Sequence, residues 1–181
     1  IFAVGDITAD IALVNVGELE GRFAVETMFG YAHKELCYDN ISTIMFLEPE
    51  VAGVGMNEIQ AQCAGLCYRV ATWNYDCIPR AIAMRQTEGF FKILVTDDAE
   101  MRILGMRAIG QDASSAIQAV ALLISMGKGI HELAEMVHPH PSITEGVQEC
   151  VRMLLGKSIF KPQAFKQLKC LRWEGGCYSE A

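Results

Sequence analysis

The chain has 181 residues, of which 51% are hydrophobic, and it carries a net charge of −7 and seven cysteines. This length allows one domain plus part of another, and the apolar content can bury a sizeable core, which excludes an intrinsically disordered chain. The acidic balance argues against nucleic acid as a partner, because phosphate binding depends on clustered lysine and arginine. No apolar run reaches the roughly 18–20 residues of a membrane helix, so no membrane partner is expected. The odd cysteine count and the lack of a leader pattern predict reduced thiols, no metal site and a cytoplasmic location.

The N-terminal part of the sequence predicts one strand and one helix. Residues 1–4 are apolar and are predicted to form a short buried strand. Apolar positions then recur at helical spacing over residues 11–29, and Gly30 is a plausible helix end. The polar, mixed stretch over residues 31–40 is predicted to connect two units.

The middle of the sequence predicts an antiparallel sheet. Asn57 is expected to cap a short helix over residues 57–63, and polar turns separate the segments rich in β-branched and aromatic residues. The predicted strands cover residues 43–47, 51–55, 68–73, 90–95 and 102–110.

Helical patterns follow the strands. Asp112 is a candidate cap for a helix over residues 113–127, and further helices are predicted over residues 130–137 and 142–156. Because strands come first and helices afterwards, the fold class is predicted to be α+β, an antiparallel sheet with flanking helices.

The segment from Lys157 onward differs in composition, with five basic and two acidic residues. A basic tail on an acidic body predicts a solvated or surface-docked extension. Cys170 and Cys177 flank two glycines, a flexible setting in which two thiols could meet. The favoured interpretation is a disordered tail with incidental cysteines.

The densest polar cluster is His-Pro-His-Pro-Ser-Ile-Thr-Glu at residues 138–145. A proline-flanked turn can present the His140 imidazole outward, while Glu145 bonds one ring nitrogen and leaves the other free to take a proton. The alternative is structural: Ser142-x-x-Glu145 is also a capping box, in which Glu145 satisfies an amide at the helix start. Spacing alone favours the structural alternative.

Several motifs, in order, resemble the pyridine nucleotide-disulfide oxidoreductases. Residues 1–6 resemble the last FAD-contacting motif of that family, and residues 43–55 resemble the strand pair that opens its interface domain. Residues 88–94 and 103–105 are similar to the central hairpin of that domain, and residues 138–145 to the family's catalytic His-Glu motif. The resemblance covers about residues 1–160, and the doubled histidine is most similar to dihydrolipoamide dehydrogenase.

The resemblance implies a domain organisation. Residues 1–36 would be the end of the FAD-binding domain, residues 38–158 the interface or dimerisation domain, and residues 159–181 a basic C-terminal extension. The interface domain would form a two-fold homodimer, which would bring the His-Glu turn of one subunit to the flavin and redox cysteines of the other.

The resemblance also implies cofactor contacts. Asp6 would bond the ribityl chain of FAD, and Leu13, Val14 and Asn15 would lie near the isoalloxazine ring. Asn15 stands where dihydrolipoamide dehydrogenases usually have histidine.

His140 and Glu145 would be the catalytic residues of the implied reaction. His140 would take a proton from a dihydrolipoamide thiol, and Glu145 would orient His140. Electrons would pass from the dithiol to an enzyme disulfide, then to FAD and then to NAD⁺. The implied partner, besides a second copy of the chain, is the lipoyl domain of a 2-oxo acid dehydrogenase complex.

The sequence also departs from the family pattern. The redox pair Cys-x₄-Cys and both glycine-rich nucleotide fingerprints are absent from these 181 residues. The chain by itself is therefore expected neither to retain FAD nor to turn over. Two alternatives stay open: a relative similar to glutathione, thioredoxin or mercuric reductase with a redox-active tail at Cys170 and Cys177, and a stand-alone, non-catalytic dimerisation module.

Overall fold

The computed structural model describes residues 1–31 and 35–181. The chain forms two compact units, Ile1–Ile41 and Ser42–Ala181. The predicted connector over residues 31–40 and the first predicted domain both include residues 32–34, which lie outside the described residues, and the predicted domain boundaries stay predictions. In the part of the chain that the structure describes, no helix has the length and apolar character needed to cross a bilayer.

The first unit is built around one helix. The helix α1 (Val14–Met28) follows the short 3₁₀ helix η1 (Gly5–Thr8). The predicted helix is thus present, but the predicted strand over residues 1–4 is wrong. A strand needs a neighbour to satisfy its backbone groups, and no strand among the described residues pairs with this segment.

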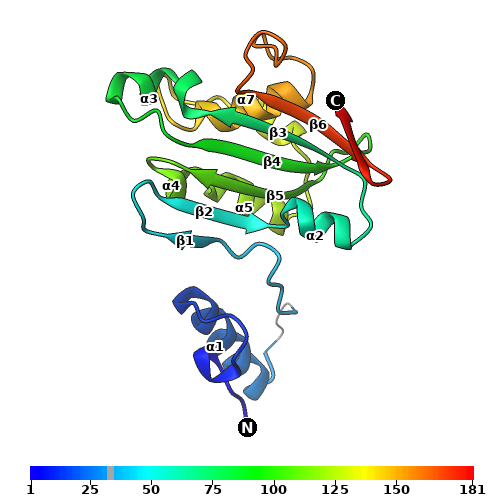
Figure 1. The fold of residues 1–181 in the computed structure, drawn as a ribbon. Helices are drawn as coiled ribbons and strands as arrows, with labels where there is room; N and C mark the ends of the chain where they lie inside the picture. The colour runs from blue at the N-terminus through cyan, green and yellow to red at the C-terminus, as the bar shows by residue number, and fades with distance from the viewer. Residues whose placement is uncertain (32–34) are drawn as a thin grey trace. The chain divides into compact units, whose positions relative to one another are not determined.

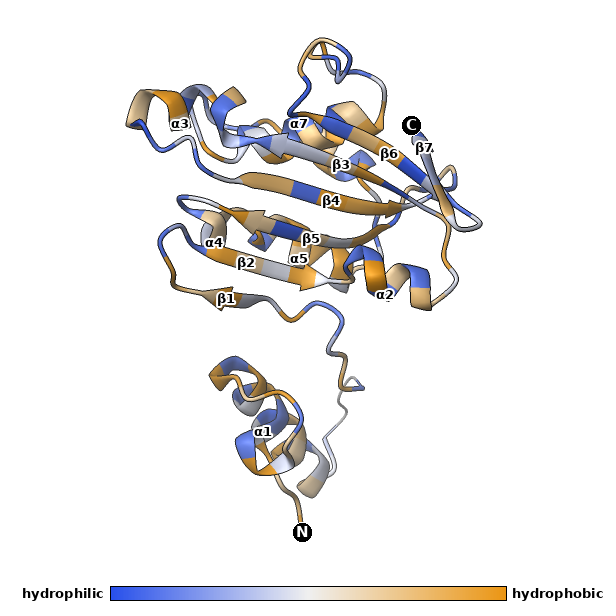
Figure 2. Ribbon diagram, in the orientation of Figure 1, coloured by the Kyte–Doolittle hydropathy of each residue, from blue (hydrophilic) through white to orange (hydrophobic). Residues whose placement is uncertain are grey.

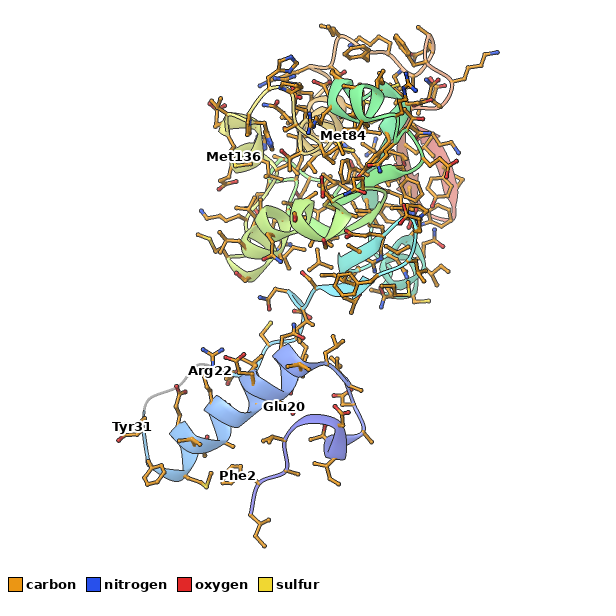
Figure 3. The ribbon with its side chains drawn as sticks, turned by 90° about the vertical axis from the view of Figure 1, so that its left-hand side faces the viewer. Phe2, Glu20, Arg22, Tyr31, Met84 and Met136 are labelled. Atoms are coloured by element: carbon orange, nitrogen blue, oxygen red, sulfur yellow. The ribbon has the colours of Figure 1, made fainter. Side chains whose placement is uncertain are left out.

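Glu20 of α1, labelled in Figure 3, ties the helix to the segments on either side. Its carboxylate accepts a hydrogen bond from the Gly5 N–H at 2.6 Å and another from the Tyr38 hydroxyl at 3.1 Å. These bonds satisfy a carboxylate that is almost fully buried. Gly17 allows the close approach, since a Cβ there would lie only 3.3 Å from the Gly5 Cα.

The second unit is a seven-stranded sheet in which every neighbouring pair is antiparallel (Figure 1). The strand order is β1-β2-β5-β4-β3-β6-β7. All five predicted strands are present, and two more follow near the C-terminus. The strands are β1 (Thr43–Met45), β2 (Val51–Gly55), β3 (Tyr68–Asn74), β4 (Phe90–Thr96), β5 (Ile103–Ile109), β6 (Lys169–Glu174) and β7 (Cys177–Glu180).

Helices lie against this sheet, so the predicted α+β class is confirmed. Figure 1 shows α4, α5 and α7 behind the sheet and α2 in front of it. The helices are α2 (Glu58–Cys63), α3 (Pro79–Met84), α4 (Ala113–Ala116), α5 (Gln118–Ser125), α6 (His131–Glu135) and α7 (Glu145–Leu154), with a 3₁₀ turn η2 (Tyr75–Cys77).

Two predicted helix caps had different outcomes. Asn57 caps α2 as predicted: its side chain accepts from the Gln60 N–H at 2.9 Å, and the Gln60 side chain accepts from the Asn57 N–H. Asp112 does not cap α4, because its backbone is left-handed and its side chain makes no capping bond. The helix predicted over residues 113–127 is divided at Ile117 into α4 and α5.

The two faces of the sheet have different roles. Because strand side chains alternate, Ala71 and Trp73 of β3 point to one face while Val70 and Thr72 point to the other. The first face carries the main core, in which these β3 residues pack with the buried side of α7, including Val147. The opposite face carries a smaller buried cluster of Ala61, Tyr68, Val70 and Leu94. We call this second side the outer face.

The C-terminal segment is ordered in the structure, so the prediction of a disordered tail is wrong. Strand β6 pairs with β3 from Lys169 opposite Thr72 to Trp173 opposite Tyr68, and β7 then pairs with β6. The physical reason is pairing: β3 would otherwise present an unpaired edge, and β6 satisfies it.

Candidate active site

The loop between α6 and α7 carries the His-Pro-His-Pro sequence. Each histidine precedes a proline, which disfavours helix, and α7 begins only at Glu145. The His140–Pro141 peptide bond is cis. The helix predicted from residue 142 starts three residues later, at Glu145.

The structure brings His140 and Glu145 together. The Nδ1 of His140 lies 2.7 Å from Oε1 of Glu145, and Oε2 of the same carboxylate accepts a hydrogen bond from the Ser142 N–H at 2.8 Å. The His140 side chain is 69% exposed, whereas that of Glu145 is only 21% exposed. The carboxylate thus fixes one ring nitrogen while the rest of the imidazole faces solvent.

Both sequence interpretations of Glu145 describe part of this geometry. One oxygen bonds the imidazole, as an orienting group requires, and the other bonds the Ser142 amide, as a capping box requires. The box is only half formed, however: Thr144 is the residue before the helix, and no side chain caps the helix start. The Ser142 hydroxyl instead lies 3.1 Å from the Thr144 hydroxyl.

The local electrostatics favour an ionised Glu145. Partial burial acts to raise the pKa of this carboxyl group, but the Ser142 amide and His140 outweigh burial and hold the pKa below its usual value. The neighbouring His138 differs, because its burial lowers its pKa and favours the neutral ring. Its Nε2 is buried without a hydrogen-bond partner in the described part of the chain.

The predicted FAD contacts belong to the first unit. Asp6 lies in η1 with an exposed side chain. Leu13 precedes α1, and Val14 and Asn15 open its first turn. No side chain caps this helix start, and only from Val16 onward do its amides bond the Leu13 carbonyl oxygen. The positive end of the helix dipole therefore remains available to a polar ligand group. These residues therefore fit a flavin.

The comparisons with known proteins identify the family. Residues 41–151 match the model of the pyridine nucleotide-disulphide oxidoreductase dimerisation domain. The chain belongs to this family. Its dimerisation domain comprises strands β1 to β5 and most of the helix layer described above, and the resemblance in the sequence motifs is confirmed.

Curated relatives of this oxidoreductase chain support the same family assignment. It is 30% identical over 161 residues to dihydrolipoyl dehydrogenase 3 of Haloarcula marismortui, covering 89% of this chain and 33% of the relative. It is 33% identical over 159 residues to dihydrolipoyl dehydrogenase of Geobacillus stearothermophilus, covering 88% of this chain and 33% of that relative. A mercuric reductase of Lysinibacillus sphaericus is 30% identical over 161 residues, covering 89% and 29%. The chain thus spans about one third of the length of these relatives.

Two solved structures show the same fold. LpdA from Mycobacterium tuberculosis superposes with a TM-score of 0.79 at 24% identity, covering 85% of this chain and 33% of that one. The HOCl-induced flavoprotein disulfide reductase RclA from Escherichia coli, in its Cu(II) complex, has a TM-score of 0.76 at 26% identity, covering 85% and 35%.

The cysteines of the tail do not favour a redox-active extension on this dimerisation domain. Cys170 is buried, its Sγ lies 3.8 Å from the Met153 carbonyl oxygen, and burial raises the pKa of its thiol. Cys177 is exposed and pairs in register with Glu174 rather than with Cys170. Within the described residues, no group of three potential ligands could hold a metal ion.

The sequence analysis missed one residue that shapes the site. Gly146 lies in the first turn of α7, where a Cβ would come within 2.6 Å of both Ile78 Cδ1 and Phe91 Cδ2. Only glycine lets the helix start approach the sheet this closely and so place Glu145. The available signal was an isolated glycine inside a helical pattern.

Proposed function

We propose that this chain supplies the dimer interface and the acid–base pair of a flavin-dependent dithiol–disulfide oxidoreductase of the dihydrolipoyl dehydrogenase type. The reaction would convert dihydrolipoamide and NAD⁺ to lipoamide, NADH and a proton. One observation carries the proposal: an exposed imidazole, His140, has its Nδ1 2.7 Å from the carboxylate of Glu145. The dihydrolipoyl dehydrogenases among the relatives support the substrate class.

His140 and Glu145 would together transfer the proton of the substrate thiol. Since Glu145 is ionised, it accepts the Nδ1–H of His140, which leaves Nε2 with its lone pair free. A substrate thiol that gives its proton to Nε2 becomes a thiolate, the form that attacks a disulfide. Glu145 then stabilises the imidazolium, which returns the proton in the reverse direction.

The cofactor contacts follow from the first unit. Asp6 and the start of α1, at Leu13, Val14 and Asn15, would hold the FAD of the complete enzyme. When bound, FAD supplies the two-electron acceptor between the dithiol and NAD⁺. The uncapped N-terminus of α1 supports this assignment, because its amides suit an electron-rich ring edge.

The proposed partner is a second copy of the chain. Dimerisation is what the matched domain is named for, and the helix layer exposes apolar side chains such as Leu122 and Met126, which are 60% and 58% exposed. The lipoyl domain of a 2-oxo acid dehydrogenase complex is the proposed substrate carrier, and the proposed location is cytoplasmic.

The decisive experiment uses the protein at the full length that its gene encodes. We expect His140→Gln to reduce the rate of flavin reduction by dihydrolipoamide by at least about 10²-fold, the usual contribution of a general acid–base group. Reduction of the same flavin by NADH should change much less, because that direction does not begin with a substrate thiol. The control is His131→Gln, which alters an exposed histidine on α6.

Full dithiol-driven reduction in the His140→Gln enzyme would count against the proposal. The expectation that residues 1–181 alone lose FAD is a separate prediction, and a yellow protein with stoichiometric flavin from this chain would contradict it.

A further inference from the structure

A row of basic side chains crosses the outer face of the sheet. Lys169 of β6 lies opposite Thr72 of β3, Thr72 lies opposite Lys92 of β4, and Lys92 lies opposite Arg107 of β5. Directly opposed residues share a face, so these side chains lie on one side of the sheet. Figure 2 shows the corresponding hydrophilic bands within the otherwise hydrophobic strands β4 and β5.

The row borders an open groove, which we call the outer groove, of about 590 Å³. Its lining combines polar side chains with apolar surface from Phe90 and Leu171, and the polar ones include Thr72, Lys92, Lys169 and the acidic Glu58. The groove is therefore amphipathic: a basic line runs beside apolar strips. It lies on the face opposite α7 and the His140 turn.

Positive charge exceeds negative charge at this groove. Lys92 pairs with Glu58 at 2.6 Å. Arg107 directs its guanidinium to the carbonyl oxygens at the end of β2, at 2.8 and 2.9 Å, rather than to a carboxylate. Lys169 has no ion-pair partner within the described residues. Two lysines, Lys92 and Lys169, and one carboxylate, that of Glu58, therefore line the groove, on a chain whose net charge is −7.

Side-chain hydrogen bonds attach the C-terminal hairpin, which carries Lys169, to the rest of the sheet. The fully buried carboxylate of Asp97 receives hydrogen bonds from both Arg69 and Arg172, which joins β6 to the turn after β4. At the other strand of the hairpin, the Tyr178 hydroxyl lies 2.8 Å from the Tyr68 hydroxyl. The groove wall is therefore part of the fold, and it lies beyond the residues that match the family model.

We infer that the outer groove binds an acidic, extended peptide segment of a partner protein. A single small anion in so open a groove would gain little, because solvent screens exposed charge pairs. A segment with several glutamate or aspartate residues would reach Lys169 and Lys92 together, since two strand spacings separate them by about 9.5 Å. Its apolar side chains would cover Phe90 and Leu171. Duplex nucleic acid fits poorly, because it requires many phosphate contacts.

The test measures binding of a fluorescein-labelled octapeptide with five glutamates and three leucines by fluorescence anisotropy. The wild-type chain should bind it, and added salt should weaken the binding. Lys169→Glu should raise Kd at least about tenfold, because it reverses the charge that has no internal partner. The matched control is Lys166→Glu, the same change at an exposed tail lysine that does not line the groove.

Three outcomes would overturn the inference. They are no binding of the acidic octapeptide at millimolar chain concentration, equal weakening by Lys166→Glu and Lys169→Glu, and tighter binding of a DNA oligonucleotide than of the octapeptide. The circular dichroism spectrum of Lys169→Glu should match the wild type, since Lys169 makes no structural ion pair. Because the groove and the His140 pair lie on opposite faces, this result is separable from dithiol oxidation.

Discussion

Gly146 lies against the ring of Phe91 so closely that a Cβ on the glycine would be 2.6 Å from the Phe91 Cδ2. The same Cβ would meet Ile78 at 2.6 Å, and both neighbours are fully buried. Neither can move aside without disturbing the core. The contact sets the position of the first turn of α7, and with it the position of Glu145.

Gly146→Ala should destabilise the second unit. We expect a loss of about 1–3 kcal/mol in the free energy of unfolding, the usual effect of overpacking a core. Urea unfolding followed by tryptophan fluorescence measures it, because Trp73 and Trp173 both lie in the second unit. The control is Gly21→Ala in α1, where a Cβ meets nothing within 4 Å. A wild-type unfolding curve for Gly146→Ala would show that the contact relaxes freely.

Glu145 should remain ionised to unusually low pH. Its pKa in the folded chain lies below the ordinary value, so its contacts stabilise the fold above the ordinary glutamate range. That stabilisation is lost as the pH falls through the lowered pKa. The ¹³C shift of the Glu145 carboxyl group, followed between about pH 7 and pH 2, should report this midpoint. The Ser142 amide should move with the same midpoint, and a different midpoint would contradict their hydrogen bond.

Glu145→Gln should remove the preference of the His140 ring for one of its two neutral tautomers. In the wild type at alkaline pH, the carboxylate selects the Nδ1–H form of His140, because it can only accept a hydrogen bond. The amide can donate or accept, so the variant should show a mixture of tautomers in ¹⁵N spectra of the ring. Glu135→Gln, at the end of α6, serves as the control and should leave the His140 spectrum unchanged. A wild type already dominated by the Nε2–H form would contradict the proposed proton acceptor.

Asp97→Asn should loosen the C-terminal hairpin. The carboxylate is fully buried between Arg69 and Arg172, and those arginines outweigh the effect of burial and lower its pKa. Breaking a buried pair costs about 3–5 kcal/mol, but both arginines are partly exposed, so we expect a loss of about 2 kcal/mol. The measurements are urea unfolding and the rate of tryptic cleavage within residues 157–172.

The matched control for that change is Glu100→Gln. Glu100 also pairs with an arginine, Arg102, at 3.6 Å, but its side chain is 76% exposed. An exposed pair contributes at most about 1 kcal/mol, so the variant should unfold and be cleaved like the wild type. If both variants behaved alike, burial of Asp97 would not be what secures the hairpin.

Leu122→Asp should weaken self-association. Leu122 is 60% exposed on α5, in the helix layer proposed to meet a second copy, and an unpaired charge there would be buried on dimerisation. Light scattering at micromolar concentration should give a dimer mass for the wild type and a monomer mass for the variant. Ile59→Asp is the control, because Ile59 is 70% exposed and belongs to α2, which Figure 1 shows on the side of the sheet away from α5. A monomeric wild type would contradict the proposed homodimer.

The limits of the sequence patterns are clearest at the C-terminal hairpin. Residues 169–174 were assigned to a basic, disordered tail, although Gly175–Gly176 between two short runs is a recognised hairpin signal. Composition obscured the pattern, because basic residues outnumber acidic ones five to two over residues 157–181 and suggested a solvated tail. Its stability depends on Asp97 and on the edge of β3, which are distant in the sequence and invisible to any local window.

In the active-site turn, too, the local sequence predicted part of the arrangement and tertiary packing decided the rest. The prolines and the five-residue spacing predicted that Glu145 could reach His140, but spacing alone could not decide between an orienting carboxylate and a capping one. The folded chain uses one carboxylate oxygen for each. This outcome depends on Gly146, whose contact with Phe91 arises only when α7 packs on the sheet.

The sequence by itself determined the strands over residues 43–110, the cap at Asn57, the α+β class and the family, because alternation, capping and motif order are local properties of a chain. Only the tertiary structure decided the strand order, the attachment of β6 to β3, and the basic row from Lys169 to Arg107. These features depend on which segments distant in the sequence become neighbours. The lowest free energy of the whole unit determines this, through the pairing of strand edges and the burial of apolar sheet and helix faces.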